Sequence, residues 1–237
     1  MTASRAALTR DDLRVRISVQ HVRLGGVEHR VIRPARPLRN GALYRSHSFY
    51  DMYVDRADGR RIATLFLLAA RSPRSLVHLP TRAAPTAPDV GWLGEQPLDL
   101  VLAHRATQFP VTRWKRLRER LNAGNAPREL RTARVPLGDV PAGEESSGTP
   151  VDDHWRRDPL RQHVHARTLF LTGGTGAFRE AARDLLDVTR EGPPAAATRL
   201  YIPGSCNYHV CRLLHAWEDL DHGREQFHVE FCPTWAR

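Results

Sequence analysis

The sequence has 237 residues, of which 41% are hydrophobic and 26% charged, the composition of a folded globular protein. Thirty-five of its 36 basic residues are arginine, and the formal net charge is +10. Such a surplus attracts polyanions, so it indicates a partner rather than a fold. No apolar run reaches about 18 residues and residues 1–16 lack a signal-peptide core, so we expect a cytoplasmic protein that does not enter a membrane.

Residues 1–80 are predicted to form an antiparallel β layer. Residues 13–20 alternate with period two, which places Val15 and Ile17 on one face and Arg14 and Arg16 on the other. Asp58-Gly59 is interpreted as a hairpin turn before a continuous apolar run. Further strands are expected at residues 27–33, 42–54, 62–69 and 76–79.

Beyond a Pro- and Gly-rich loop at residues 81–97, the pattern changes to strands followed by helices. We expect three strand–helix units at residues 98–122, 167–190 and 200–220, then a closing strand at 226–232. The acidic stretch 138–158 is predicted to be a surface loop. Strands that alternate with helices are typical of a parallel sheet with crossover connections.

The sequence therefore predicts an α/β (or α+β) fold. An N-terminal antiparallel β layer is followed by a Rossmann-like βα segment with a short parallel sheet. We expect a single domain over residues 1–237, with a possible subdivision into 1–80 and 98–237.

The helix after Pro110 carries most of the basic surplus. Its expected buried stripe is Val111, Trp114, Leu117 and Leu121. Residues 113–134 hold eight basic and two acidic residues, which is +6 of the chain's +10. Guanidinium groups can bind two phosphate oxygens at once, although such a run can also be a solvated face. With the outer arginines of the first strands, the predicted nucleic-acid-binding residues are Arg14, Arg16, Arg45, Arg113, Lys115, Arg116, Arg118, Arg120, Arg128 and Arg131.

Residues 43–53 interleave Tyr and Phe with Arg45 and His47. This pattern occurs on RNA-binding sheets, where aromatic rings stack on bases. The alternative, which the preference of aromatic residues for strands favours, is that these rings pack within the protein.

The turn Gly173, Gly174, Thr175 and Gly176 lies between a predicted strand and a predicted helix. Backbone N–H groups at a helix start bind anions, so this turn is a candidate anion site. It lacks the lysine of a P-loop, and a sharp bend alone also explains it.

The loop at residues 203–209 contains four weak candidates for catalysis, namely Ser205, Cys206, Tyr208 and His209. They follow a predicted strand, where open α/β sheets bind ligands, but helix capping explains Ser205 as well. An odd count of three cysteines argues against a disulfide framework. Because no paired C-x-x-C accompanies Cys206 and Cys211, no metal site is predicted, and no cofactor either.

These observations favour a basic nucleic-acid-binding protein, with RNA preferred over DNA, that is a subunit of a nucleoprotein complex and has other protein subunits as possible partners. The alternative is an enzyme acting on a phosphorylated or nucleotide ligand at the carboxyl ends of the parallel strands. The sequence leaves open whether the protein catalyses any reaction.

Overall fold

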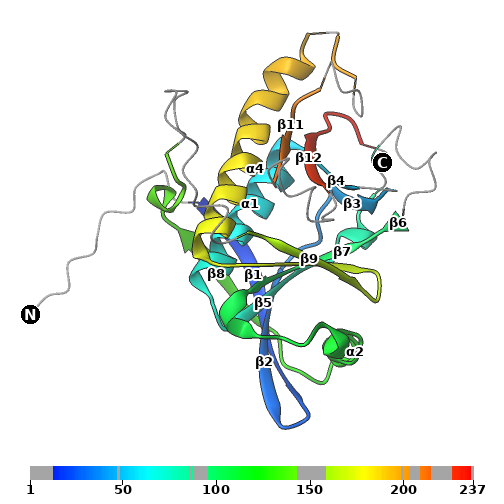
Figure 1. The fold of residues 1–237 in the computed structure, drawn as a ribbon, viewed down its shortest axis with the longest axis vertical. Coiled ribbons are helices and arrows are strands. Elements are labelled where there is room, and N and C mark those ends of the chain that lie inside the picture. The colour runs from blue at the N-terminus through cyan, green and yellow to red at the C-terminus, as the bar shows by residue number, and fades with distance from the viewer. Residues whose placement is uncertain are drawn as a thin grey trace, which may run out of the picture.

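The computed structural model describes residues 13–46, 49–85, 87, 96–142, 159–198, 200–202, 209–214 and 226–235. Within these residues the chain forms twelve strands in two mixed sheets and three helices (Figure 1). Both sheets contain parallel as well as antiparallel pairs. The predicted α/β class is confirmed.

The larger sheet has seven strands in the order β8-β1-β2-β5-β7-β10-β9. The pairs β2–β5 and β7–β10 are parallel, and the other pairs are antiparallel. Strands from the first half of the sequence therefore form the centre of this sheet, and strands from the second half form both of its edges. The bounds are β1 Leu13–Leu24, β2 Val27–Pro34, β5 Ser75–Leu79, β7 Asp99–His104, β8 Glu129–Val135, β9 Arg161–His165 and β10 Thr168–Gly173.

The smaller sheet has the order β11-β12-β4-β3-β6, and only its β12–β4 pair is parallel. It joins the last described strand of the chain to strands from the first quarter of the sequence. Its members are β3 Gly41–Arg45, β4 Phe49–Val54, β6 Gln96–Pro97, β11 Cys211–Leu213 and β12 Gln226–Phe231.

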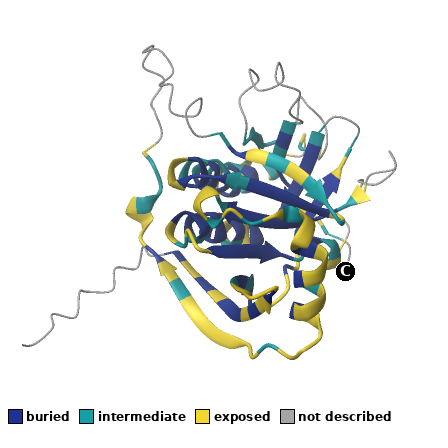
Figure 2. Cartoon of the chain, turned by 60° about the horizontal axis from the view of Figure 1, so that its bottom comes forward, coloured by how far each residue is buried: buried dark blue, intermediate teal, exposed yellow. Residues whose placement is uncertain are grey.

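Helices α1 (Arg56–Arg71) and α4 (Thr175–Ala196) pack on each other and share one apolar core with both sheets. Helix α2 (Trp114–Asn122) covers the opposite face of the larger sheet. Its buried residues Trp114, Leu117 and Leu121 are those of the expected stripe, and each stabilises the fold by roughly 1.5–3 kcal/mol. Figure 2 shows the buried residues gathered in the interior of the fold, whereas the edge strand β8 is exposed along most of its length.

The predicted strand at residues 62–69 is wrong, because these residues lie in α1. Asp55 caps the helix by accepting a hydrogen bond from the Asp58 backbone N–H, so Asp58-Gly59 is the first helical turn and not a hairpin. Helix α1 is covered by α4 and by both sheets, which buries it on nearly every side. A helix buried all round has the same continuous apolar run as a buried strand, and the periodicity therefore could not separate the two.

The third strand–helix unit is also wrong in the part that the structure describes. Residues 200–202 are not a strand, and Cys211–Leu213, expected in a helix, form β11 beside β12. The Tyr201 hydroxyl donates to the Phe231 carbonyl at 2.5 Å and accepts from the Val210 N–H at 3.2 Å. These tertiary contacts and the β12 ladder override the local helical pattern. The remaining units are confirmed, with α4 extending six residues beyond the expected end at residue 190.

Candidate anion-binding site

A row of polar side chains crosses the larger sheet on the face that α2 covers. Ser18 of β1 is paired with Arg33 of β2. The parallel β2–β5 register, continued by one residue beyond the pair Ile32–Val77, places His78 of β5 beside Arg33. Thr168 of β10 is paired with Asp99 of β7. Directly paired residues project to the same face of a sheet, so strands remote in sequence bring these groups together next to α2.

Asp99 is the carboxylate at the centre of this row. Its side chain is only 4% exposed and lies 2.8 Å from an Arg82 Nη, 3.5 Å from an Arg118 Nη and 3.8 Å from His78 Nε2. Burial by itself would raise the pKa of Asp99, but the contacts with His78 and Arg82 outweigh it and lower this pKa to about 2. Asp99 is therefore ionised.

His78 contributes no charge to the site. Burial is the main cause that lowers its pKa, and Arg33 and Arg118 lower it further, against the raising effect of Asp99. Its ring packs edge-on against Trp114 with the centroids 4.9 Å apart. Apart from the 3.8 Å contact of Nε2 with Asp99, neither ring nitrogen has a hydrogen-bond partner within the described part of the chain.

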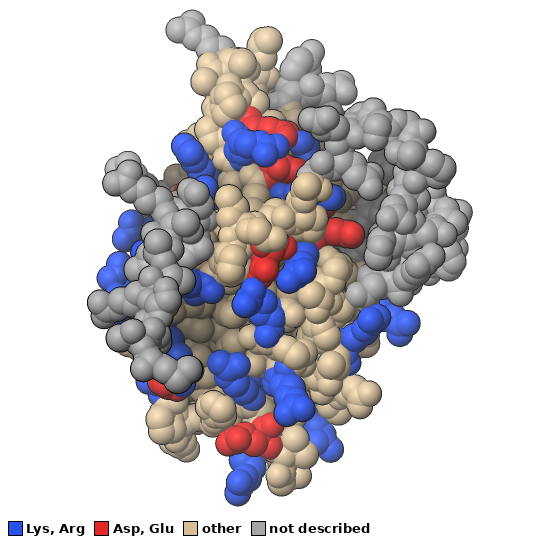
Figure 3. Space-filling model, turned by 90° about the vertical axis from the view of Figure 1, so that its left-hand side faces the viewer, with Lys and Arg blue, Asp and Glu red and all other residues tan. Residues whose placement is uncertain are grey.

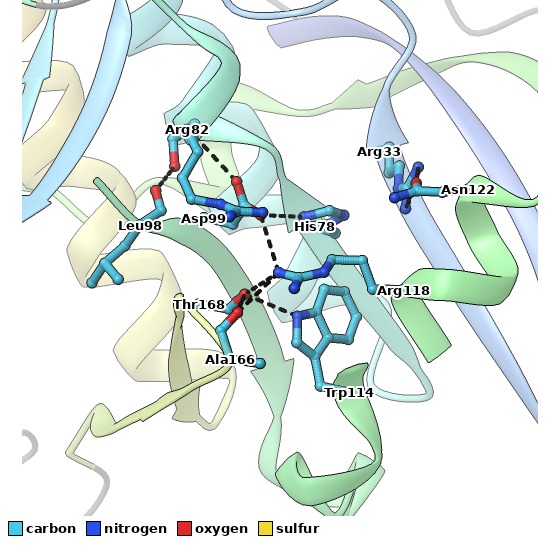
Figure 4. A network of polar contacts seen from close by, with 11 residues as sticks. Arg33, His78, Arg82, Leu98, Asp99, Trp114, Arg118, Asn122, Ala166 and Thr168 are labelled. Atoms are coloured by element: carbon cyan, nitrogen blue, oxygen red, sulfur yellow. Dashed lines mark hydrogen bonds and ion pairs between the residues drawn. The ribbon is translucent and has the colours of Figure 1, made fainter. Parts of the chain in front are cut away.

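Arg118 joins helix α2 to the sheet. Its Nη1 donates to the Ala166 carbonyl at 3.0 Å and to Thr168 Oγ1 at 3.1 Å (Figure 4). The Trp114 Nε1–H donates to the same hydroxyl at 2.9 Å. This predicted phosphate ligand is therefore held in place by the fold.

Arg33 lies on the other side of His78 from Asp99 (Figure 4). Its two Nη groups donate to Asn122 Oδ1, both at 3.3 Å, and its buried Nε has no partner among the described residues. Burial lowers the pKa of Arg33, and the neighbouring Arg128 and Arg118 lower it further. The fold thus holds a guanidinium partly out of water with only a neutral amide as ligand.

We define the arginine cluster as Arg33, Arg82 and Arg118, which are partly buried near Asp99, together with the exposed Arg128 beside Arg33. Four guanidinium groups and one carboxylate leave a net charge of +3, because His78 is neutral. A partly buried excess of charge is unfavourable unless a counter-charge offsets it. Guanidinium forks match the oxygens of phosphate, so a phosphate group is the counter-charge that this geometry suits best.

The other predicted arginines fall into two groups. Arg14 and Arg16 are exposed on the same face of β1 as Ser18, and Arg14 is paired with Arg134 of β8. The basic residues on the outer side of α2 are exposed as well, namely Arg113, Lys115, Arg116 and Arg120. Arg131 instead projects to the other face, where it forms an ion pair with Glu129 at 2.6 Å.

The aromatic residues of the 43–53 stretch pack inside the protein where the structure describes them. Tyr44, Tyr50 and Tyr53 are buried, and only Phe49 is half-exposed. Arg45 is exposed, with its guanidinium 6.0 Å from the centre of the Tyr50 ring. His47 lies outside the described residues. The packing interpretation of this stretch therefore accounts for the rings that can be placed.

The turn at Gly173–Gly176 does begin a helix, α4, but it is remote from the arginine cluster. Gly173 is paired with His104 at the carboxyl ends of β10 and β7, whereas Thr168 and Asp99 lie at the amino ends of the same strands. A Cβ atom added to Gly173 would lie 2.7 Å from a Leu160 methyl group, so packing accounts for this glycine. Anion binding at the turn stays a prediction.

Of the predicted catalytic loop, Ser205, Cys206 and Tyr208 lie outside the described residues. His209 is half-buried, and sequence reasoning missed its neighbour Cys211 as a chemically distinctive group. Hydrogen bonding to the side chains of His209 and His228 lowers the pKa of Cys211 to about 6.

The described residues contain no group of three His, Cys, Asp or Glu side chains arranged to hold a metal ion.

Sequence reasoning found Arg118 and Arg128 but missed Arg33 and Arg82, which are half of the arginine cluster, and their neighbours His78 and Asp99. Arg33, Arg82, His78 and Asp99 share no local motif, and only the order of the strands brings them together. The one available signal was a lone aspartate at the start of the apolar strand Asp99–His104.

Comparisons of the chain with protein families, with characterised proteins and with solved structures give no match. None of the helices in the described residues is long and apolar enough to span a membrane.

Proposed function

We propose that the protein binds nucleic acid through the phosphate backbone, with the arginine cluster as the central contact. The observation that carries this proposal is the net +3 charge of four guanidinium groups, three of them partly buried, near a single carboxylate. Solvated arginines on a surface would form no such cluster, because holding like charges together at reduced solvation costs free energy.

Further arginines extend the basic surface away from the cluster. Arg14, Arg16 and Arg134 are exposed on the same side of the sheet, and Arg113 and Arg116 continue along α2. Figure 3 shows the side of the molecule that lies to the left in Figure 1, away from α2, and there too the described basic side chains outnumber the acidic ones. A backbone that runs past the cluster would therefore meet a succession of cations.

The mode of binding that follows is electrostatic and has little base specificity. Contacts to phosphate position a nucleic acid but do not distinguish its sequence. The buried tyrosines of the 43–53 stretch offer no ring faces for stacking. In this proposal RNA stays the favoured ligand, and the protein stays a subunit of a nucleoprotein complex.

The test is a salt titration of binding to a fluorescent single-stranded RNA of about 20 nucleotides, beside DNA of the same sequence. About four phosphate contacts predict a log–log slope of roughly −3 for a single strand. The variant Arg33→Gln should weaken binding by about tenfold, roughly the worth of one charged hydrogen bond. Arg74→Gln is the matched control, because Arg74 is exposed and outside the cluster. A flat salt dependence, or equal losses in both variants, would refute the proposal.

A further inference from the structure

A second basic site lies on the other side of the larger sheet. A cavity of about 590 Å³ opens between the start of α1, the carboxyl-terminal half of α4 and the segment 137–141. This volume is within the range of small-molecule sites. The cavity is lined by α1 and α4, whereas the arginine cluster is on the α2 side, so the two are separate sites.

Four arginines and one aspartate line this cavity. Arg190 forms an ion pair with Asp187 at 2.9 Å, and Arg183 forms one with Asp184 at 3.3 Å. In the described parts of the chain, Arg56 and Arg60 have no ion pair. The cavity therefore offers two guanidinium groups whose charge the surrounding described residues do not neutralise.

The positions of Arg56 and Arg60 on α1 are unfavourable in the absence of an anion. They are four residues apart on one helix face, where like charges repel. They also occupy the first turns of α1, where the helix dipole disfavours cations. Asp58 does not compensate them, because its carboxylate accepts from the backbone N–H groups of Arg39 and Asn40 and pairs with Arg61.

Apart from Thr189, the rest of the cavity wall is apolar. Leu13, Leu137, Val140, Leu186 and two prolines of α4, Pro193 and Pro194, contribute to it. Leu137 is 47% exposed although it is a large apolar side chain. A wall of this kind stabilises the hydrocarbon part of a ligand by burying it from water.

We propose that this cavity binds a small organic phosphate that carries an apolar group. The phosphate lies against Arg56 and Arg60, and the apolar group lies against Leu137, Val140 and Pro193. This inference does not depend on nucleic-acid binding, since it concerns a different face and a ligand with a hydrocarbon part.

The test is isothermal titration calorimetry of the full chain with phenyl phosphate, inorganic phosphate and phenol. We expect phenyl phosphate to bind more tightly than either of the other two. The double variant Arg56→Gln/Arg60→Gln should weaken phenyl phosphate binding at least tenfold, and Arg74→Gln should leave it within twofold of the unmodified chain. Leu137→Ser should reduce the affinity for phenyl phosphate to that for inorganic phosphate.

Two results would overturn the proposal. One is equal affinity for phenyl phosphate and inorganic phosphate, which would indicate general attraction to a basic protein. The other is an unchanged affinity in both the double arginine variant and Leu137→Ser. RNA affinity measured on the double variant separates the two sites: we expect it to match that of Arg74→Gln, and a selective loss would instead assign the cavity to the nucleic-acid surface.

Discussion

At the scale of single residues, Asp99 decides whether the arginine cluster is stable. Among the described residues it is the only carboxylate in contact with Arg82 and Arg118, and it is buried. Its pKa of about 2 in the folded protein lies below its usual value of 3.8, so folding favours the ionised form. Stability from this group is therefore present above pH 3.8 and is lost as the pH falls toward 2.

Replacing Asp99 by Asn should destabilise the protein by roughly 3 kcal/mol at pH 7, because it leaves the partly buried guanidinium groups without their counter-charge. Urea unfolding of the two proteins between pH 5 and pH 2 measures this. The difference between them should shrink as Asp99 becomes protonated in the unmodified protein. A difference that stays constant over this range would show that Asp99 acts by packing and not by charge.

Cys211 is the second residue whose environment changes its chemistry. With a pKa of about 6, set by His209 and His228, its thiol is mostly thiolate at pH 7. The rate of alkylation by iodoacetamide should rise through pH 6, and His228→Gln should move this rise to higher pH. Peptide mass spectrometry provides an internal control, since the buried Cys232 should react slowly. Alkylation of Cys211 that begins only near pH 8–9, the range of an ordinary thiol, would contradict the prediction.

At the scale of elements, the alternation of buried and exposed residues located those that have one exposed face, and the buried strands β5, β7 and β10 were also predicted correctly. Strand β1 and helix α2 each alternate between buried and exposed residues with the period of their own structure, and both were located correctly. The sequence did not locate helix α1 or strand β11. The first is buried on nearly every side, and the second is held by its pairing with β12, so their local sequences carry no distinguishing period.

Helix α4 contains two glycines that should respond differently to alanine. A Cβ atom on Gly192 would overlap the Phe231 side chain, whereas one on Gly176 would meet no atom within 4 Å. Gly192→Ala should therefore destabilise the protein by about 1–3 kcal/mol, the usual cost of overpacking a core. Gly176→Ala should be neutral or stabilising, because alanine has the higher helix propensity. Thermal melts of both variants test this, and equal melting temperatures would mean that α4 and β12 do not pack as described.

At the scale of the whole molecule, the net charge could be read from composition, but the place where it is concentrated could not. Arg33 and Asp99 are 66 positions apart in the sequence (99 − 33), and two intervening strand pairings bring them together. The basic run 113–134 was the visible signal, yet the structure divides it. Arg118 and Arg128 belong to the cluster, whereas Arg131 projects to the opposite face.

A basic chain attracts polyanions whether it is folded or not, and this allows a last test of the cluster. A ligand raises the melting temperature only if it binds the folded state better than the unfolded one. If net charge alone drove binding, RNA would bind both states of this +10 chain and the melting temperature would change little. With a folded cluster, RNA at about 100 times its dissociation constant should add roughly 2.7 kcal/mol, or about 5–10 °C for a chain of this length. The same RNA should stabilise Arg33→Gln by less and Arg74→Gln fully. A small and equal shift in all three proteins would mean that composition, and not the arrangement of Arg33, Arg82 and Arg118, determines the affinity.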